Sequence, residues 1–281
     1  MRHSARRRAL VIAGSTVIAG FALVAPAYAA TSGPSATTAV TGAPHTASGA
    51  TLQPGGTIQH VVRPSTALSG GRNASSTSTN WSGYAATGST YTSVASSWTE
   101  PTGTCKSGDQ YSSFWVGLDG YNSNSVEQTG TDTDCAGRTP QYYAWYEMYP
   151  GPSENYSNTV RAGDHFNATV TWLSGDKFSL YIADTTQGWS HTTDASLTST
   201  PARSSAEVIV EAPCCTGSGG ILPLTDFGTV NITSSMANGS AIGNAGGLTS
   251  ITMIDNEGRD KDTVSALSGG ENFSATWVRS N

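Results

Sequence analysis

The chain has 281 residues, a net charge of −6 and only 12% charged residues. All 20 acidic residues lie from Glu100 onward with eight of the 14 basic residues, so this part carries a net charge of −12. Such an acidic region argues against nucleic acid as a partner, because phosphate contacts need lysine and arginine. The part of the chain after Asn80 is long enough for one large domain.

Residues 1–29 have the pattern of an export signal. Arg6-Arg7-Arg8 precedes an apolar stretch over residues 9–25, and Ala27-Tyr28-Ala29 has the small-x-small form of a cleavage site. A membrane anchor is disfavoured because the stretch is short, contains glycine, serine and threonine, and precedes a cleavage signal. The sequence therefore predicts a secreted protein with no membrane association after cleavage.

Residues 30–73 differ in composition from the rest of the chain. They are rich in Thr, Ser, Ala, Gly and Pro, with no acidic residue and with Arg63 and Arg72 as the arginines. Such a segment cannot bury much apolar surface, so it reads as a propeptide or a disordered linker. Both alternatives stay open, and one folded domain is expected over residues 74–281.

The four cysteines of an exported chain suggest disulfides. Three pairings are possible. Cys105 and Cys135 flank an expected hairpin centred near residues 120–122, which favours a Cys105–Cys135 bond. Cys214 and Cys215 are then left as a vicinal disulfide or as free thiols.

The histidines and cysteines do not form the sequence pattern of a metal site or of a serine hydrolase. After residue 80 the chain holds only His165 and His191, and its cysteines lack C-x-x-C spacing. A G-x-S-x-G elbow is missing from the sequence as well. We therefore expect no metal and no cofactor, and a serine hydrolase is disfavoured.

The sequence after Asn80 predicts β-strands throughout. Its short segments are rich in Val, Ile, Thr, Tyr, Phe and Trp, are separated by Gly, Ser, Asn and Asp, and show no sustained helical period. This pattern predicts an all-β fold, a two-sheet antiparallel β-sandwich of the jelly-roll, concanavalin A-like kind. The expected strands cover residues 81–86, 91–98, 111–118, 125–131, 142–149, 165–173, 177–183, 206–211, 228–232, 248–254 and 272–278.

Alternation within these strands gathers polar and aromatic side chains on one face of a sheet. Mixed aromatic and acidic side chains suit a substrate groove better than a dry core, where unpaired carboxylates are costly. The expected members of this face are Trp115, Asp119, Gln128, Trp145, Glu147 and Glu207.

At these residues the chain resembles the glutamic peptidase (eqolisin) family. The similarity covers essentially the whole region from about residue 78 to 281, with five motifs in the family's order. They are Asn80-Trp81-Ser82-Gly83-Tyr84, Phe114-Trp115-Val116-Gly117-Leu118-Asp119-Gly120, Glu127-Gln128-Thr129-Gly130, Ala144-Trp145-Tyr146-Glu147-Met148-Tyr149-Pro150 and Ala206-Glu207-Val208-Ile209.

The resemblance implies a β-sandwich with a substrate cleft and a catalytic glutamine and glutamate, which fall on Gln128 and Glu207. It also implies that Trp115, Asp119, Trp145 and Glu147 line or support the cleft. The implied activity is metal-independent cleavage of proteins at acidic pH. The chain departs from the fungal pattern at Tyr143, where a fungal relative has an acidic residue, and this difference bears on the cleft and its pH range.

The chemistry of the pair fits peptide hydrolysis without a covalent intermediate. Glu207 can take a proton from water and return it to the leaving nitrogen. Gln128 can orient the water and donate to the developing oxyanion. The sequence thus predicts an acid-acting endopeptidase, by default a monomer, with protein or peptide substrates.

Two other functions remain open at this stage. A carbohydrate-binding sandwich also uses tryptophan, tyrosine and acidic side chains on a curved sheet. A glycoside hydrolase could use Glu147 and Glu207 as its two carboxylates. The first would release no peptides from denatured protein, and the second would not need Gln128.

Overall fold

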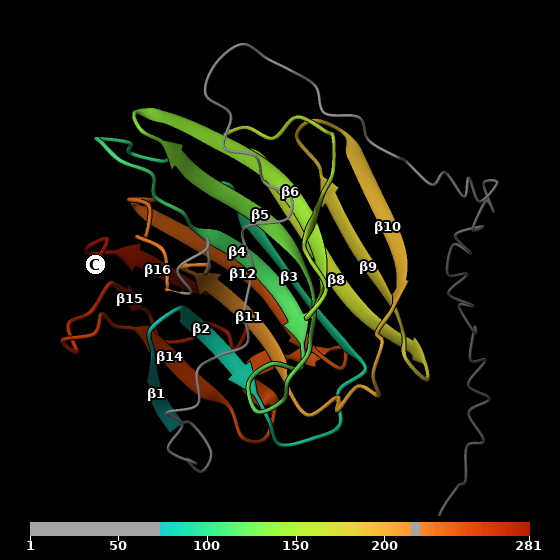
Figure 1. The fold of residues 1–281 in the computed structure, drawn as a ribbon. Coiled ribbons are helices and arrows are strands. Elements are labelled where there is room, and N and C mark those ends of the chain that lie inside the picture. Colours follow the sequence, from blue (N-terminus) through green and yellow to red (C-terminus); the bar gives the residue numbers. More distant parts are fainter. Residues whose placement is uncertain (1–73, 215–219) are drawn as a thin grey trace, which may run out of the picture. The chain divides into compact units, whose positions relative to one another are not determined.

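The computed structural model describes residues 74–214 and 220–281, which fold into two β-sheets (Figure 1). The expected signal peptide and propeptide or linker lie outside these residues. The first sheet has the order β1 (Ala74–Ser78), β14 (Thr249–Met253), β2 (Trp81–Ala86), β11 (Ala206–Glu211), β4 (Ser113–Leu118), β5 (Val126–Ala136), β6 (Thr139–Tyr149) and β7 (Glu154–Asn155).

The second sheet packs against the first. Its order is β10 (Trp189–Ser196), β9 (Lys177–Asp184), β8 (His165–Ser174), β3 (Ser93–Thr99), β12 (Thr229–Ala237), β16 (Phe273–Trp277) and β15 (Asp262–Val264), with β13 (Ser240–Ala241) paired to β12. A 3₁₀ turn covers Ile242–Asn244. Among the described strands the ladders are antiparallel except for β1–β14, which is parallel. The predicted all-β sandwich is confirmed.

The hydrophobic core lies between the sheets. The first sheet contributes side chains such as Leu118 and Val208, and the second contributes Phe166, Leu180 and Ile182, all fully or almost fully buried. A second apolar cluster, built on Trp81, Trp115 and Trp145, lies on the other face of the first sheet. This sheet therefore has one face in the core and a second, aromatic face that carries the polar groups described below.

Each expected strand has a counterpart, and two of them, β2 and β11, match in both bounds. The strands that were not expected are β1, β7, β10, β13 and β15. The longest of these, β10, is an edge strand in which half-buried and exposed residues alternate. Its sequence, WSHTTDAS, has few apolar side chains, because only one of its faces touches the rest of the domain.

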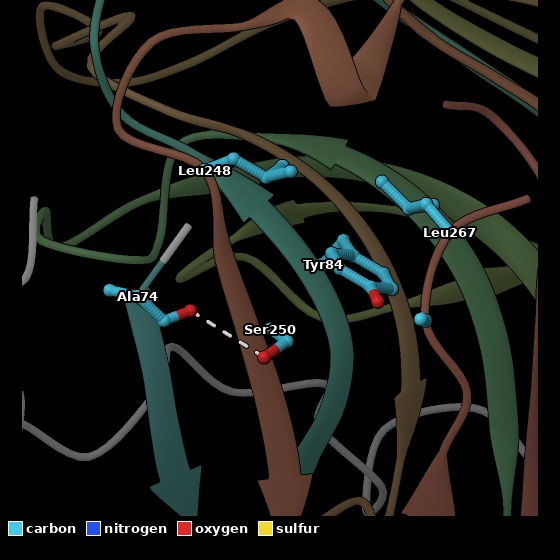
Figure 2. A pocket seen from close by; sticks show the side chains of 6 residues that line it. Ala74, Tyr84, Leu248, Ser250 and Leu267 are labelled. Carbon is cyan, nitrogen blue, oxygen red and sulfur yellow. Dashed lines mark hydrogen bonds between the residues drawn. The ribbon is translucent and has the colours of Figure 1, made fainter. Parts of the chain in front are cut away.

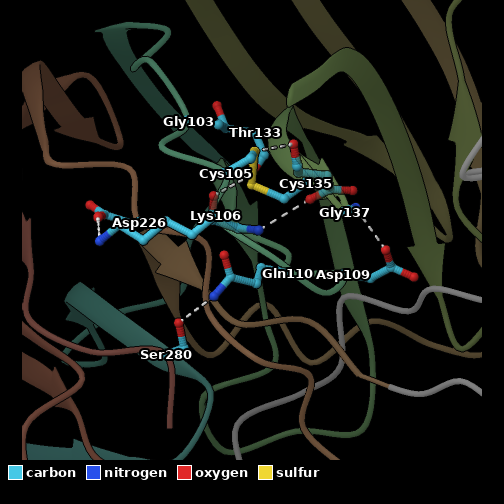
Figure 3. Close-up of a disulfide and its surroundings, with 12 residues drawn as sticks. Gly103, Cys105, Lys106, Asp109, Gln110, Thr133, Cys135, Gly137, Asp226 and Ser280 are labelled. Carbon is cyan, nitrogen blue, oxygen red and sulfur yellow. Dashed lines mark hydrogen bonds and ion pairs between the residues drawn. A yellow bond between two sulfur atoms is a disulfide. The ribbon is translucent and has the colours of Figure 1, made fainter. Parts of the chain in front are cut away.

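The predicted Cys105–Cys135 disulfide is confirmed (Figure 3). Cys135 sits near the end of β5, and its backbone pairs with Gln110 just before β4, so the bond closes the open end of the β4–β5 hairpin. Cys214 carries no free thiol, and Cys215 lies outside the described residues. Within the described part of the chain, no helix is long and apolar enough to cross a membrane.

Candidate active site

Four residues form a row across the aromatic face of the first sheet. In the strand register Glu207 on β11 lies opposite Gly117 on β4, Gly117 lies opposite Gln128 on β5, and Gln128 lies opposite Glu147 on β6. Residues directly opposite in a ladder point to the same face. Glu207, Gln128 and Glu147 therefore share one face, as alternation predicted, although Glu207 is 79 positions from Gln128 in the sequence.

Gly117 leaves a gap in this row between Gln128 and Glu207. With neighbouring strands about 4.8 Å apart, the backbones that carry these two residues are about 10 Å from each other. A Cβ on Gly117 would lie 2.8 Å from Trp115 Cζ3 and 3.3 Å from Gln128 Cβ. The space directly above the glycine is thus taken up by the edge of the Trp115 indole and by Val126 and Gln128, and Gly117 places no side chain of its own there.

Gln128 is oriented by its neighbour on β6. Its Nε2 donates a hydrogen bond of 3.0 Å to Oε2 of Glu147, and both residues are fully buried. A glutamine amide has two N–H donors and one carbonyl, so this bond uses one donor and fixes the plane of the amide. The bond also distinguishes the two ends of the amide, because the nitrogen faces Glu147.

Glu207 is fully buried at 0% exposure. Burial raises its pKa well above the usual value, the Ser205 hydroxyl and the Tyr121 backbone oppose the shift, and the charges of Asp119 and Glu127 add to it. Desolvation has this sign because it disfavours the charged form of a carboxyl group. Glu207 is therefore a stronger base when ionised than an exposed glutamate.

The two predicted tryptophans occupy the next row of the same face. Trp115 lies opposite Gly130, which lies opposite Trp145, so a second glycine gap separates the indoles. Trp115 Nε1 donates to Glu211 Oε2 over 2.8 Å, and Trp145 Nε1 donates to Asp132 Oδ1 over 2.6 Å. Each indole is thus held by a buried carboxyl group, which fixes its ring in the floor of the face.

Asp119 is placed differently from the other predicted residues. It follows the end of β4 with a positive φ of 69°. Its carboxylate accepts bonds from the backbone N of Arg203 at 2.7 Å and of Ser204 at 2.8 Å, and from the Ser204 hydroxyl at 3.0 Å. Asp119 therefore ties the turn that leads into β11, and so holds the strand that carries Glu207.

Three further acidic residues lie on this face and were not predicted as part of the site. Glu211 is four positions after Glu207, and Asp132 and Asp134 are four and six positions after Gln128, so strand alternation places all three on the aromatic face. All three are fully buried. The period of two was the available signal, since it already groups these residues with the predicted pair.

A pocket elsewhere on the first sheet is unrelated to this row (Figure 2). It has a volume of about 220 Å³ and is lined by residues that include Ala74, Tyr84, Leu248 and Leu267. Tyr84 pairs with Val208, the neighbour of Glu207, so it points to the opposite face of the sheet. The pocket therefore opens beside the edge strand β1 rather than at the predicted site.

Comparison with known protein families matches residues 79–277 to the model described as the Peptidase A4 family. Among curated relatives, Aspergillopepsin-2 of Aspergillus niger is 28% identical over 224 residues, covering 72% of this chain and 78% of its own length. Scytalidopepsin B of Scytalidium lignicola is 31% identical over 140 residues, covering 47% of this chain and 51% of its own.

Solved structures of glutamic peptidases are also similar to this chain. A scytalido-glutamic peptidase bound to a peptide-based transition-state analogue aligns with a TM-score of 0.61 at 25% identity, over 71% of this chain and 98% of that one. The aspergilloglutamic peptidase of Aspergillus niger aligns with a TM-score of 0.53 at 28% identity, over 60% of this chain and 99% of that one. The two-sheet fold is thus shared with a group of peptidases.

Proposed function

The chain belongs to the Peptidase A4 family, the glutamic endopeptidases, and from that premise we propose that it cuts peptide bonds with a water molecule held between Gln128 and Glu207. The observation that carries this proposal is the register of the first sheet, in which both residues lie directly opposite Gly117. The substrate carbonyl and the water would lie between the side chains of Gln128 and Glu207, with no side chain from Gly117 between them.

In this mechanism Glu207 is the general base. Its carboxylate removes a proton from water as the water attacks the carbonyl carbon, and the same proton then passes to the leaving nitrogen. No covalent bond to the enzyme forms in either step. The raised pKa of Glu207 makes the carboxylate a stronger base, and it makes the protonated group available over a wider pH range for the second step.

Gln128 stabilises the charge that develops on the carbonyl oxygen. Its amide does not titrate in this range, so it can donate a hydrogen bond whatever the pH. The bond to Glu147 fixes which end of the amide faces the gap. We assign Trp115 and Trp145 to the floor of the substrate cleft, and Asp119 and Glu147 to the support of the catalytic pair.

We also propose export, acid activity and independence of metals. The N-terminal pattern of Arg6-Arg7-Arg8 and Ala27-Tyr28-Ala29 supports export. The solved relative bound to a peptide-based analogue supports peptide substrates. Acid activity is proposed from the family match and not from the raised pKa of Glu207, which must lose its proton to act as the base.

The test is peptide release from denatured protein as a function of pH, for the wild type and for Glu207→Gln and Gln128→Ala. Each variant is expected to fold and to lose at least about 10³-fold in kcat, the scale of losing a general base or an oxyanion donor. Chelators should leave the wild type unaffected. The matched control is Asp194→Asn, which neutralises an exposed acid on β10 of the other sheet and should retain full activity.

A Gln128→Ala variant with wild-type activity would refute the proposed pair. It would instead favour a pair of carboxylates, Glu147 and Glu207. The hydrogen bond from Gln128 weighs against that alternative, because it occupies one carboxyl oxygen of Glu147.

A further inference from the structure

A buried cluster on the aromatic face joins Tyr143 to two aspartates. Tyr143 Oη lies 2.8 Å from Asp132 Oδ2 and also within hydrogen-bond distance of Asp134 Oδ2. Asp132 Oδ1 in turn accepts the bond from Trp145 Nε1 at 2.6 Å. Both aspartates are 0% exposed and Tyr143 is 9% exposed. The cluster therefore links the acidic end of β5 directly to an indole of the cleft.

The proton count of this cluster is fixed by its geometry. A phenol has one hydrogen and can donate it to one carboxylate only. If both aspartates were ionised, the second carboxylate would face a phenol oxygen with no hydrogen between them, at a buried site where unpaired charge is costly. The arrangement is satisfied when one aspartate is protonated and donates to the phenol oxygen.

The remaining contacts show which aspartate holds the proton. Asp132 already accepts a hydrogen bond from Trp145, so it is the better acceptor for the phenol hydrogen as well. The other oxygen of Asp134 accepts only a longer bond, 3.2 Å from the backbone N of Ser112. One arrangement of hydrogen bonds satisfies all of these groups. The protonated Asp134 donates to the Tyr143 oxygen, and the Tyr143 hydroxyl and Trp145 Nε1 both donate to Asp132.

The charges that face the cluster favour retention of this proton. Glu211 approaches from β11, Glu100 from the segment after β3, and the phenol of Tyr111 from the segment before β4. None of these groups is basic, and the ion pairs among the described residues lie elsewhere, at Lys106 and Arg259. Burial raises the pKa of Asp134 well above its usual value, and the charge of Asp132 raises it further.

We infer that Tyr143, Asp132 and Asp134 form a proton-holding unit that positions Trp145 in the cleft, and that loss of its extra proton weakens substrate binding while the chemistry at Gln128 and Glu207 is preserved. This inference rests on the proposed function. Asp132 is four residues along β5 from Gln128, a distance of about 13 Å. An extended peptide covers this distance in about four residues, so the unit acts, through Trp145, on a part of the substrate away from the bond that is cut.

Two variants test the unit through kcat and KM measured separately between about pH 4 and about pH 8. In the wild type KM should rise about tenfold over this range, the scale of losing one hydrogen bond to a charged group. Asp134→Asn supplies an amide donor to Tyr143 at every pH, so the rise in KM should disappear. Tyr143→Phe removes the bridging hydroxyl, so KM should be about tenfold higher already at low pH, with kcat little changed.

Asp262→Asn is the matched control, because it removes another buried acid whose pKa is raised, on β15 and bonded to Ser82. This variant should keep the wild-type rise in KM. The unit is refuted if Asp134→Asn also keeps that rise, or if Tyr143→Phe has a normal KM at low pH.

Near-ultraviolet circular dichroism separates this inference from the proposed function, because it reports the ordering of tryptophan and tyrosine without any turnover. The wild type should show a transition near neutral pH that is missing from Asp134→Asn. A protein that cuts no peptide at any pH but shows this difference would refute the proposed function and support the unit. If Tyr143→Phe does not fold, the Asp134→Asn comparison decides the matter by itself.

Discussion

Gln128 donates its amide hydrogen to Glu147 across the β5–β6 ladder over 3.0 Å, and this bond sets the orientation of the amide within the row. The bond joins adjacent strands, so it is independent of any substrate. A residue that fixes the amide beforehand lowers the cost of arranging it during the reaction.

Replacement of Glu147 should therefore reduce kcat. We expect Glu147→Ala to lower kcat about 10- to 100-fold, because the amide of Gln128 loses its fixed plane. Glu147→Gln should lose less, since its side-chain oxygen can still accept the bond. Steady-state kinetics on one chromogenic peptide at acidic pH measure both. Equal activity of the alanine variant and the wild type would contradict the assigned role.

Gly117→Ala should damage the site without unfolding the domain. The new Cβ would meet Trp115 Cζ3 at 2.8 Å and Gln128 Cβ at 3.3 Å, so it would displace the indole and enter the gap proposed for the water. We expect kcat to fall at least about 100-fold, as for other small displacements of catalytic groups. Gly220→Ala is the control, because its Cβ would meet nothing within 4 Å. Retention of activity in Gly117→Ala would show that the gap is not the reaction site.

Stability should fall as pH rises, because carboxyl groups are buried in the domain. Burial raises the pKa of Glu127 from 4.5 to about 9 and that of Glu100 to about 8. A folded-state pKa above the unfolded value means that the folded protein binds more protons between the two values. The contribution to stability is therefore complete below about pH 4.5 and is lost as pH rises toward about pH 9.

Urea unfolding at several pH values measures this loss. Each such carboxyl group should remove on the order of 1.4 kcal/mol for every pH unit crossed. Glu127→Gln, which cannot ionise, should flatten the slope, whereas the exposed Asp194→Asn on β10 should leave it unchanged. A Glu127→Gln variant with the wild-type slope would show that this group does not control the pH dependence.

Removal of the Cys105–Cys135 disulfide should weaken the fold and spare the chemistry. The bond closes a loop with a sequence separation of 30 residues, for which loss of the cross-link is expected to cost about 3.5 kcal/mol through the entropy of the unfolded chain. The double variant Cys105→Ala, Cys135→Ala should unfold at lower urea concentration. Its kcat, measured below the unfolding transition, should match the wild type, because Cys135 is seven residues along β5 from Gln128.

Local sequence patterns predicted most of the strands and the shared face of the proposed site residues. Strands such as β2 and β11 are recognisable because most of their side chains are β-branched, aromatic or small, with the two glutamates of β11 alternating on one face. Alternation placed Trp115, Gln128 and Glu207 on one face, and the register bears this out. The edge strand β10 was not predicted. Only one of its faces contacts the rest of the domain, so its sequence has few apolar residues and shows only a weak alternating pattern.

The order of the strands could not be predicted in the same way. β11 inserts between β2 and β4, although about 90 residues separate it from β4 in the chain, and no local propensity encodes such a pairing. The role of Asp119 depends on the same long-range contact, since its partners Arg203 and Ser204 lie just before β11. The order of the motifs identifies these residues in the sequence, but only the folded sheet shows which of them form hydrogen bonds with each other.

The central position of β11 also decides when activity can begin. The strand that carries Glu207 is the last of the four site-bearing segments to leave the ribosome, and its pairing with β4 must wait for the intervening chain. Such distant pairings form slowly. A partly synthesised molecule that ends before residue 207 lacks half of its proposed reactive pair, so the order of the polypeptide itself delays proteolysis until β11 has been made.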